Sequence, residues 1–303
     1  MPTVEIENNL LNENKEEQQY LDLIQNIISS GTLEEGRNGN TYATFGNSMR
    51  FSLQNGQIPI LTTKKVAWDI CLKELLWFIK GSTNNYLLLE KGVHIWDGNA
   101  SRNFLDDRGL TYRSVGDLGP IYGHQWRHFN ATYYDCNTDY SRQGIDQLQY
   151  IIDQLKNPAT RNSRRLVMTA WNPCQLDEMA LPPCHILCQF NVHGGNKLSC
   201  SLYQRSADFL LGVPFNITSY GILTHLIAKH CGLEAYEFIH FMGNCHVYEE
   251  HLEGAKLQIT RKPYCFPTIT ITQVRDSIND YTVEDFELNN YLSHPKIKFE
   301  MIA

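Results

Sequence analysis

The sequence lacks any segment that suits a membrane or a secretion pathway. No apolar run among its 303 residues approaches the roughly 20 residues needed to cross a bilayer. The N-terminus is polar and acidic, without the basic and then apolar stretches of a signal peptide. These absences predict a cytoplasmic protein without a membrane segment. The hydrophobic content of 42% suffices for one large domain or two small ones.

A paired arrangement of cysteines is also absent. The nine cysteines are odd in number and scattered, which is typical of reduced thiols rather than of a disulfide framework. Cys184, His185 and Cys188 stand close enough together to suggest zinc, but no second pair follows at ligand spacing. The later cysteines are single: Cys200, Cys231, Cys245 and Cys265. We therefore predict that the protein binds no metal.

Positive charge is scarce, since 26 Lys and Arg residues stand against 33 Asp and Glu residues and leave a formal net charge of −7. Nucleic acid is therefore at most a secondary partner. An anionic ligand would have to be held by arginines that gather locally. The densest positive cluster, residues 161–165, is either a solvated loop or an anion site. The glycine-punctuated stretch 31–40, which carries Arg37, is either a plain surface loop or a phosphate-binding one.

The spacing of apolar residues predicts one compact α+β domain, because strands and helices do not alternate regularly and no repeat or linker is present. The domain is expected to span 16–303 and to follow a flexible N-terminal tail, 1–15. Helices are expected at 16–29, 66–80, 145–155, 215–232 and 244–257, the last with His246 and Tyr248 in its first turn. Strands are expected at 41–52, 58–63, 166–171, 185–192, 198–204, 268–274 and 296–301.

A glutamate lies on the apolar face of the helix expected at 66–80. Glu74 is four residues from Ile70 and four from Phe78, so the three side chains share one face. A carboxylate on an apolar stripe has a raised pKa and can act as an acid or base near neutrality. The alternative is a glutamate at the edge of the stripe that reaches water.

The stretch Leu181-Pro182-Pro183-Cys184 holds a cysteine where a rigid turn enters a strand, because the two prolines fix the backbone. Such a mounting suits a nucleophile, although a buried structural thiol is the commoner fate of a cysteine. A thiol with a pKa near 8.5 is only about 3% thiolate at pH 7. We expect Arg205, near the end of a neighbouring strand, to lower the pKa of Cys184.

Several motifs, in order along nearly the whole chain after residue 15, closely resemble the thymidylate synthase family. They are 181–185 (LPPCH), 204–208 (QRSAD), 212–217 (GVPFNI), 74–78 (ELLWF), 95–97 (IWD), 122–127 (YGHQWR), Arg164-Arg165 and 246–248 (HVY). The resemblance implies a mixed sheet packed with helices, one face of which forms a homodimer interface. It also implies reductive methylation of dUMP to dTMP, with 5,10-methylenetetrahydrofolate as the donor of both carbon and hydride and no other cofactor.

The resemblance implies roles for individual positions. Cys184 would form a covalent bond to C6 of dUMP. The catalytic set would be Cys184, Glu74, Tyr122, Arg205, Asn216 and Asp208. Binding of dUMP would use Arg37, Arg164, Arg165, Gln204, Arg205, Ser206, Asp208, Asn216, His246 and Tyr248, with Arg164 and Arg165 donated across the dimer interface. Folate would contact Lys64, Ile95, Trp96, Asn99, Asp208, Leu211, Gly212, Phe215 and the C-terminal Ala303.

Two rivals to this interpretation stay open. A pyrimidine deoxynucleotide hydroxymethylase would capture the intermediate with water, but Asn216 offers the acceptor and donors that match uracil rather than cytosine. The second rival is an inactive nucleotide-binding or RNA-binding relative, against which the intact set of site residues speaks. The sequence departs from the family at a few positions: Asn244 stands where aspartate is usual, and Asn38, Asn40 and Ala303 also differ.

Overall fold

The computed structural model describes residues 14–36 and 39–301, so most of the predicted tail, together with Arg37 and Ala303, lies outside the described residues. The α-helices are α2 (Lys15–Ser30), α3 (Trp68–Ile79), α4 (Tyr86–Leu89), α5 (Arg102–Asp107), α6 (Tyr122–His128), α7 (Gln147–Lys156), α8 (Gly212–His230) and α9 (Leu252–Ile259). The strands are β1 (Thr32–Gly36), β2 (Gly39–Ser52), β3 (Val167–Thr169), β4 (His185–His193), β5 (Lys197–Asp208), β6 (Glu234–Tyr248), β7 (Thr268–Ile271) and β8 (Phe286–Asn289). Among the helices of residues 14–36 and 39–301, none is long and apolar enough to span a membrane.

Six strands form one mixed sheet in the order β1-β2-β6-β5-β4-β3. Neighbouring strands are antiparallel except for β5 and β6, which run parallel and are joined through α8. A parallel pair needs such a crossover connection, whereas the antiparallel neighbours do not. The predicted α+β class with a mixed sheet is confirmed.

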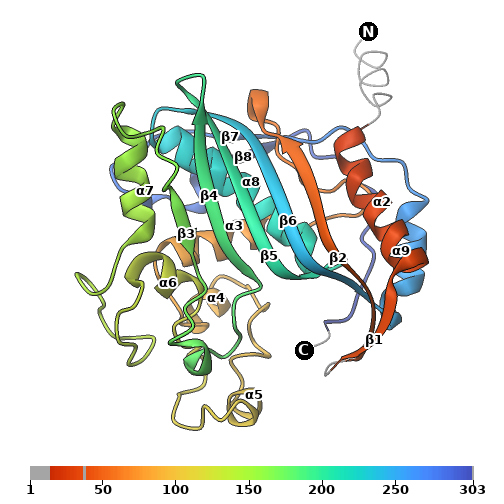
Figure 1. Cartoon of the computed structure of the whole chain (residues 1–303), viewed down its shortest axis with the longest axis horizontal. Coiled ribbons are helices and arrows are strands. Elements are labelled where there is room, and N and C mark those ends of the chain that lie inside the picture. Colours follow the sequence, from red (N-terminus) through yellow and green to blue (C-terminus); the bar gives the residue numbers. More distant parts are fainter. Residues whose placement is uncertain (1–13, 37–38, 302–303) are drawn as a thin grey trace.

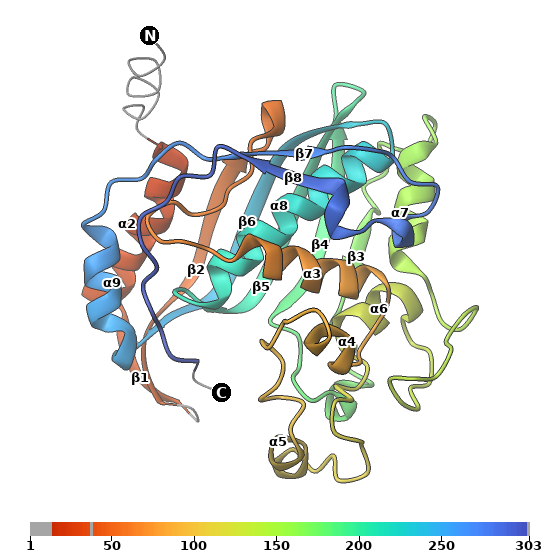
Figure 2. The same ribbon diagram turned by 180° about the vertical axis from the view of Figure 1, so that it is seen from behind.

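The two faces of this sheet differ. Figure 2 shows α8 and α3 lying across one face, and Figure 1 shows the other face without a helix across it. Cys188, Leu202, His240 and Met49 are neighbours in register across four strands, and all are buried on the helix-covered face. Residues one position away along these strands point to the opposite face, where large side chains stay exposed: Val167, Tyr203 and Phe241. An exposed apolar face of this kind is what the predicted interface requires.

The helices α3, α7 and α8 lie close to their predicted positions, whereas α6, which carries Tyr122, was not among the predicted helices. α3 begins and ends within two residues of the expected 66–80, and α7 does so for 145–155. α8 begins three residues before the expected 215 and ends two before the expected 232. It is buried on nearly all sides, which matches its largely apolar sequence.

The helix predicted over 244–257 is wrong at its start. His246 and Tyr248 lie on β6, where they alternate with the buried Cys245 and Val247, and α9 begins only at Leu252. β6 pairs with β5 on one side and β2 on the other. These partners are distant in sequence, and their pairing decides the local structure.

Three other predictions are corrected. Residues 58–63 are buried but form no strand; the backbone N–H groups of Thr62 and Thr63 donate to the Glu17 carboxylate instead of to a sheet. The predicted loop 31–40 contains β1, which pairs with the start of β2. Residues 296–301 form no strand, and β7 pairs with β8, at a stretch where no strand was predicted.

Candidate active site

Arg205 fixes the turn that carries Cys184. Its Nε donates to the carbonyl of Pro183 at 2.9 Å and its Nη2 donates to the carbonyl of Pro182 at 3.0 Å. Its backbone N–H donates to the carbonyl of Cys184 at 2.8 Å, and its guanidinium lies 5.5 Å from the ring centroid of Trp171. Two adjacent prolines have no N–H groups for regular backbone pairing, so their carbonyl groups need other hydrogen-bond donors. A planar guanidinium, which presents several N–H donors at once, can satisfy both carbonyls.

Tyr122 joins the cysteine turn to α6. Its hydroxyl oxygen accepts a hydrogen bond from the backbone N–H of Cys184 at 2.8 Å. Its ring stacks on His185 with centroids 4.1 Å apart and is almost completely buried. Burial raises the pKa of Tyr122 well above its usual range, so the phenol stays protonated and can donate its own hydrogen to a ligand or a water.

Cys184 is half-buried, and its pKa differs from the sequence-based expectation. Burial raises the pKa of the thiol, Arg205 lowers it, and Asp208 raises it. Arg205 therefore acts in the predicted direction, but the desolvation of a thiolate outweighs it and the pKa is raised overall. The predicted depression is corrected: burial favours the protonated thiol over the thiolate.

Glu74 lies near this turn on α3. Its Oε1 accepts a hydrogen bond from Trp96 Nε1 at 2.7 Å, and the Trp96 ring lies 6.1 Å from that of Tyr122. Burial raises the pKa of Glu74 from 4.5 to about 7, while the bond from Trp96 opposes the rise. A carboxyl group with such a pKa exchanges a proton near neutrality. The raised pKa expected from the apolar stripe is confirmed.

The end of β5 leads directly into α8. Asp208 Oδ1 accepts hydrogen bonds from the backbone N–H groups of Leu210 and Leu211, both at 3.1 Å, and so orders the entry to the helix. Gly212 lies beside both residues, since a Cβ at this glycine would be 3.7 Å from Asn216 Oδ1 and 3.7 Å from Asp208 Cβ. Asn216 and Asp208 are both half-buried. The motifs QRSAD and GVPFNI therefore meet at one corner.

The nucleotide residues predicted on β5 and β6 lie on adjacent strands. Asp208 is paired in register with His246, and the backbone N–H of Phe209 donates to the carbonyl of His246 at 2.9 Å. Gln204 is held inside the protein: its Oε1 contacts His240 Nε2 at 2.8 Å and its Nε2 donates to the carbonyl of Ser206 at 2.9 Å.

Lys64 is buried rather than extended into solvent. Its ammonium group donates to the carbonyl of Leu210 and lies 4.6 Å from the ring centroid of Phe299. Burial lowers the pKa of Lys64 to about 7, while Asp208 opposes the fall. The backbone carbonyl of Glu300 contacts His251 Nε2 at 2.9 Å. The C-terminal segment thus packs over Lys64 and α9.

Two predicted arginines are not gathered around Cys184. Arg164 and Arg165 are exposed in the turn that precedes β3, and the structure gives their guanidinium groups no partner within the described part of the chain. The backbone carbonyl of Arg164 accepts from Gln189 Nε2 on β4 at 3.1 Å, which places Arg164 at the border of the open sheet face. Of the other predicted folate residues, Ile95, Asn99 and Phe215 are half-buried.

Comparison with known proteins identifies the family. The family model for thymidylate synthase matches residues 18–303. The chain belongs to the thymidylate synthase family. It is 53% identical over 287 residues to a thymidylate synthase of Equine herpesvirus 2, with 94% of this chain and 98% of that protein covered.

Longer members of the thymidylate synthase family match as well. A probable thymidylate synthase of Schizosaccharomyces pombe is 52% identical over 300 residues, and a bifunctional dihydrofolate reductase-thymidylate synthase of Leishmania major is 51% identical over 291 residues. Both alignments cover 95% of this chain, but only 48% and 55% of those proteins. The chain spans about half the length of several curated relatives it matches.

Sequence reasoning missed two contacts of the site. The bond from Trp96 to Glu74 joins residues 22 apart in sequence, and the contact between Arg205 and Trp171 joins β5 to the segment that follows β3. No local pattern predicts either contact, since each depends on long-range packing. In the described ranges no group of three or more His, Cys, Asp or Glu side chains is placed to hold a metal ion.

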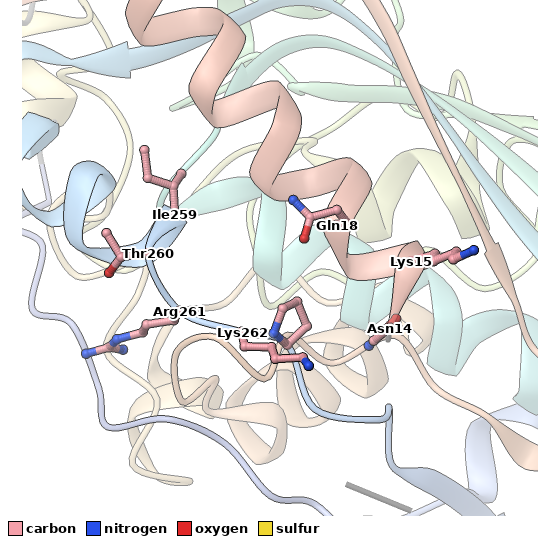
Figure 3. Close-up of a pocket in the computed structure, with 8 residues that line it drawn as sticks. Asn14, Lys15, Gln18, Ile259, Thr260, Arg261 and Lys262 are labelled. Atoms are coloured by element: carbon pink, nitrogen blue, oxygen red, sulfur yellow. The ribbon is translucent and has the colours of Figure 1, made fainter. Parts of the chain in front are cut away.

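A surface hollow lies away from these residues. It has a volume of about 450 Å³ and opens between the start of α2 and the turn after α9 (Figure 3). Its lining is polar and basic and includes none of the predicted site residues: Asn14, Lys15, Gln18, Ile259, Thr260, Arg261, Lys262 and Pro263.

Proposed function

We propose that this chain is a cytoplasmic thymidylate synthase that converts dUMP and 5,10-methylenetetrahydrofolate to dTMP and dihydrofolate. Membership of the family supports the proposal. The observation that carries it is the position of Tyr122, which bonds the Cys184 backbone and packs near the Glu74–Trp96 pair. A mounted thiol, a neutral phenol and a carboxyl group with a pKa of about 7 are thus brought together.

The proposed reaction begins at Cys184. The thiol loses its proton and the sulfur adds to C6 of the uracil ring, which makes C5 a carbon nucleophile. C5 attacks the methylene carbon of the folate as the bond from that carbon to N10 breaks, and C5 then loses its proton. The bond from the methylene carbon to N5 breaks next, which leaves an exocyclic methylene group on C5 and frees tetrahydrofolate. Hydride from the tetrahydrofolate ring reduces this methylene group to a methyl group as the sulfur leaves C6, and dihydrofolate is the second product. Arg205 lowers the cost of the anionic sulfur as this sequence begins.

Glu74 and Tyr122 handle the protons in this proposal. The pKa of Glu74, about 7, allows the group to accept and return a proton at the folate and at uracil O4 through water. Tyr122 remains a phenol and orders a water for removal of the C5 proton. Asn216 recognises uracil, because its amide carries both the acceptor and the donors that the base requires.

Binding of the two substrates follows the same corner of the fold. We propose that Arg37, Arg205 and Ser206 bind the phosphate of dUMP. His246 and Tyr248 bind the deoxyribose. Gln204 and Asp208 also lie against the nucleotide. Folate is assigned to the entry of α8 and the stretch around Trp96, with Lys64 toward its glutamate tail. The folate residues are Lys64, Ile95, Trp96, Asn99, Asp208, Leu211, Gly212, Phe215 and Ala303.

The proposal includes a homodimer that uses the open sheet face. Tyr203 and Phe241 are exposed there by 37% and 47%, and a second copy would bury them. Arg164 and Arg165 would then reach the phosphate of the partner subunit's site. The partner would thus complete the positive charge that one chain leaves incomplete.

Mixing two inactive variants tests this donation. A dimer of one Cys184→Ala chain and one Arg165→Ala chain contains one site with both wild-type groups only if Arg165 acts across the interface. Activity should therefore return on mixing under conditions that exchange subunits. Failure to recover activity in a verified mixed dimer would place Arg165 in its own chain's site.

Product analysis tests the reaction itself. Incubation with dUMP and methylenetetrahydrofolate should give dTMP and dihydrofolate in equal amounts, and Cys184→Ala should give neither. With 5-fluoro-dUMP and the folate, intact-mass analysis should show an adduct on the wild-type chain that Cys184→Ala lacks. A hydroxymethylated nucleotide with tetrahydrofolate would instead identify a hydroxymethylase, and nucleotide binding without turnover an inactive relative.

A further inference from the structure

Asn244 and His246 stand two residues apart on β6 and share one face of the strand. The distance between His246 Nδ1 and Asn244 Oδ1 is 2.8 Å. The other end of the same amide, Asn244 Nδ2, lies 3.5 Å from Glu34 Oε2 on β1. One amide therefore contacts a carboxylate on one side and an imidazole on the other.

These two contacts determine which atoms of the Asn244 amide and of the His246 ring donate hydrogen bonds and which accept them. An ionised carboxylate only accepts hydrogen bonds, so the NH₂ end of Asn244 faces Glu34 and the carbonyl end faces His246. The carbonyl oxygen also only accepts, so Nδ1 of His246 carries a hydrogen. In a neutral imidazole the remaining nitrogen, Nε2, then has a lone pair and accepts.

The surroundings of the ring favour its neutral form. Asp208 on β5 and Glu34 on β1 are the acidic groups that act on His246, and the Tyr248 ring on β6 lies 5.4 Å away in an edge-on arrangement. Burial lowers the pKa of His246, and the two carboxylates oppose the fall without reversing it. A neutral ring bonded through Nδ1 is consistent with the amide contact.

We propose that Asn244 is a positioning residue that holds His246 in the Nδ1–H tautomer, so that Nε2 accepts a hydrogen bond from the 3′-hydroxyl of the nucleotide. The recognition of the hydroxyl rests on the proposed function, whereas the tautomer rests on the contacts of Asn244 alone. An aspartate at this position would keep the acceptor for Nδ1–H. Its charge would also stabilise the imidazolium form, in which Nε2 carries a hydrogen and can no longer accept.

A substrate that lacks one hydroxyl tests the role of Asn244. The selectivity between dUMP and its 3′-deoxy analogue should be about 2- to 12-fold in the wild type, the range for one net hydrogen bond. In Asn244→Ala it should fall to the value of His246→Ala. Asn244→Asp, assayed at alkaline pH where His246 is neutral, should retain the selectivity. A merely structural role would weaken both nucleotides equally and leave the selectivity unchanged in Asn244→Ala, which would overturn the proposal.

Two measurements separate this proposal from the proposed reaction. ¹⁵N spectra of the wild-type protein should show His246 Nδ1 as protonated and Nε2 as unprotonated, and the reverse tautomer would refute the role of Asn244 without any variant. Equilibrium binding of the two nucleotides gives the same selectivity where there is no turnover. Absence of turnover alone would therefore refute the proposed reaction while the tautomer and the selectivity are still decided.

Discussion

The carboxyl group of Glu74 should destabilise the folded protein at neutral pH, and replacing it should reveal this cost. The perturbation is Glu74→Gln, which keeps an oxygen that can accept the hydrogen bond from Trp96 Nε1 but cannot ionise. Burial is the main cause of the raised pKa of Glu74. Removing the ionisation should therefore stabilise the fold while it removes the proposed proton transfers.

The size and the sign follow from linkage. The pKa of Glu74 is about 7 in the folded protein and 4.5 in the unfolded chain, so between these values the folded state binds more protons. Its stability is then highest below the unfolded pKa and falls as the pH rises to the folded one. Each pH unit is worth about 1.4 kcal/mol, which gives a total of about 3 kcal/mol. Glu74→Gln escapes this fall.

Urea unfolding of both proteins at equal concentration measures the effect. The advantage of Glu74→Gln in free energy of unfolding should grow by about 2–3 kcal/mol between about pH 5 and pH 8. Glu90→Gln, at an exposed position, is the matched control and should follow the wild type at every pH. Wild-type and Glu74→Gln profiles that stay parallel would show that Glu74 ionises without cost, and the reasoning from burial would be refuted.

Two further changes probe the support around the site. Glu17 is fully buried and accepts hydrogen bonds from the N–H and hydroxyl groups of Thr62 and Thr63. In urea unfolding, Glu17→Ala should therefore lower the free energy of unfolding by at least about 3 kcal/mol, and Glu17→Gln should lower it clearly less. A loss below about 1 kcal/mol in Glu17→Ala would contradict this expectation. At Gly254 on α9 an added Cβ would overlap the Phe299 ring. Gly254→Ala should therefore speed hydrogen exchange at 295–301 and raise the KM for folate. This is expected even though alanine favours helices more than glycine does. Combining it with Phe299→Ala should remove the further effect of the methyl group, and unchanged exchange in Gly254→Ala would show that the ring does not anchor the segment.

The sequence predicts those parts of the site that local rules determine. The turn before Cys184 depends on two adjacent prolines, and the position of Glu74 depends on helical periodicity within α3. Both were therefore predictable, and the structure agrees with them. The sequence predicts a helix where His246 lies on a strand, because β6 is determined by its pairing with β5 and β2 rather than by its own residues.

The pKa of Cys184 shows the limit of arguing from charge alone. A nearby arginine was sufficient to predict a lowered pKa, but the sign depends on how far the thiol is removed from water. That quantity comes from the packing of the whole corner of the fold. The same packing raises the pKa of Glu74, so burial shifts both groups toward their protonated forms.

Arg205 connects the geometry of the cysteine turn to its electrostatics. Its Nε and Nη2 hold the carbonyls of Pro183 and Pro182, and the same guanidinium opposes the rise in the pKa of Cys184. A lysine carries the charge but cannot present two donors in one plane. Loss of activity in an Arg205 variant would therefore report a displaced nucleophile as well as a lost charge. This is why the charge of Cys184 has to be measured on the thiol itself, with the guanidinium in place.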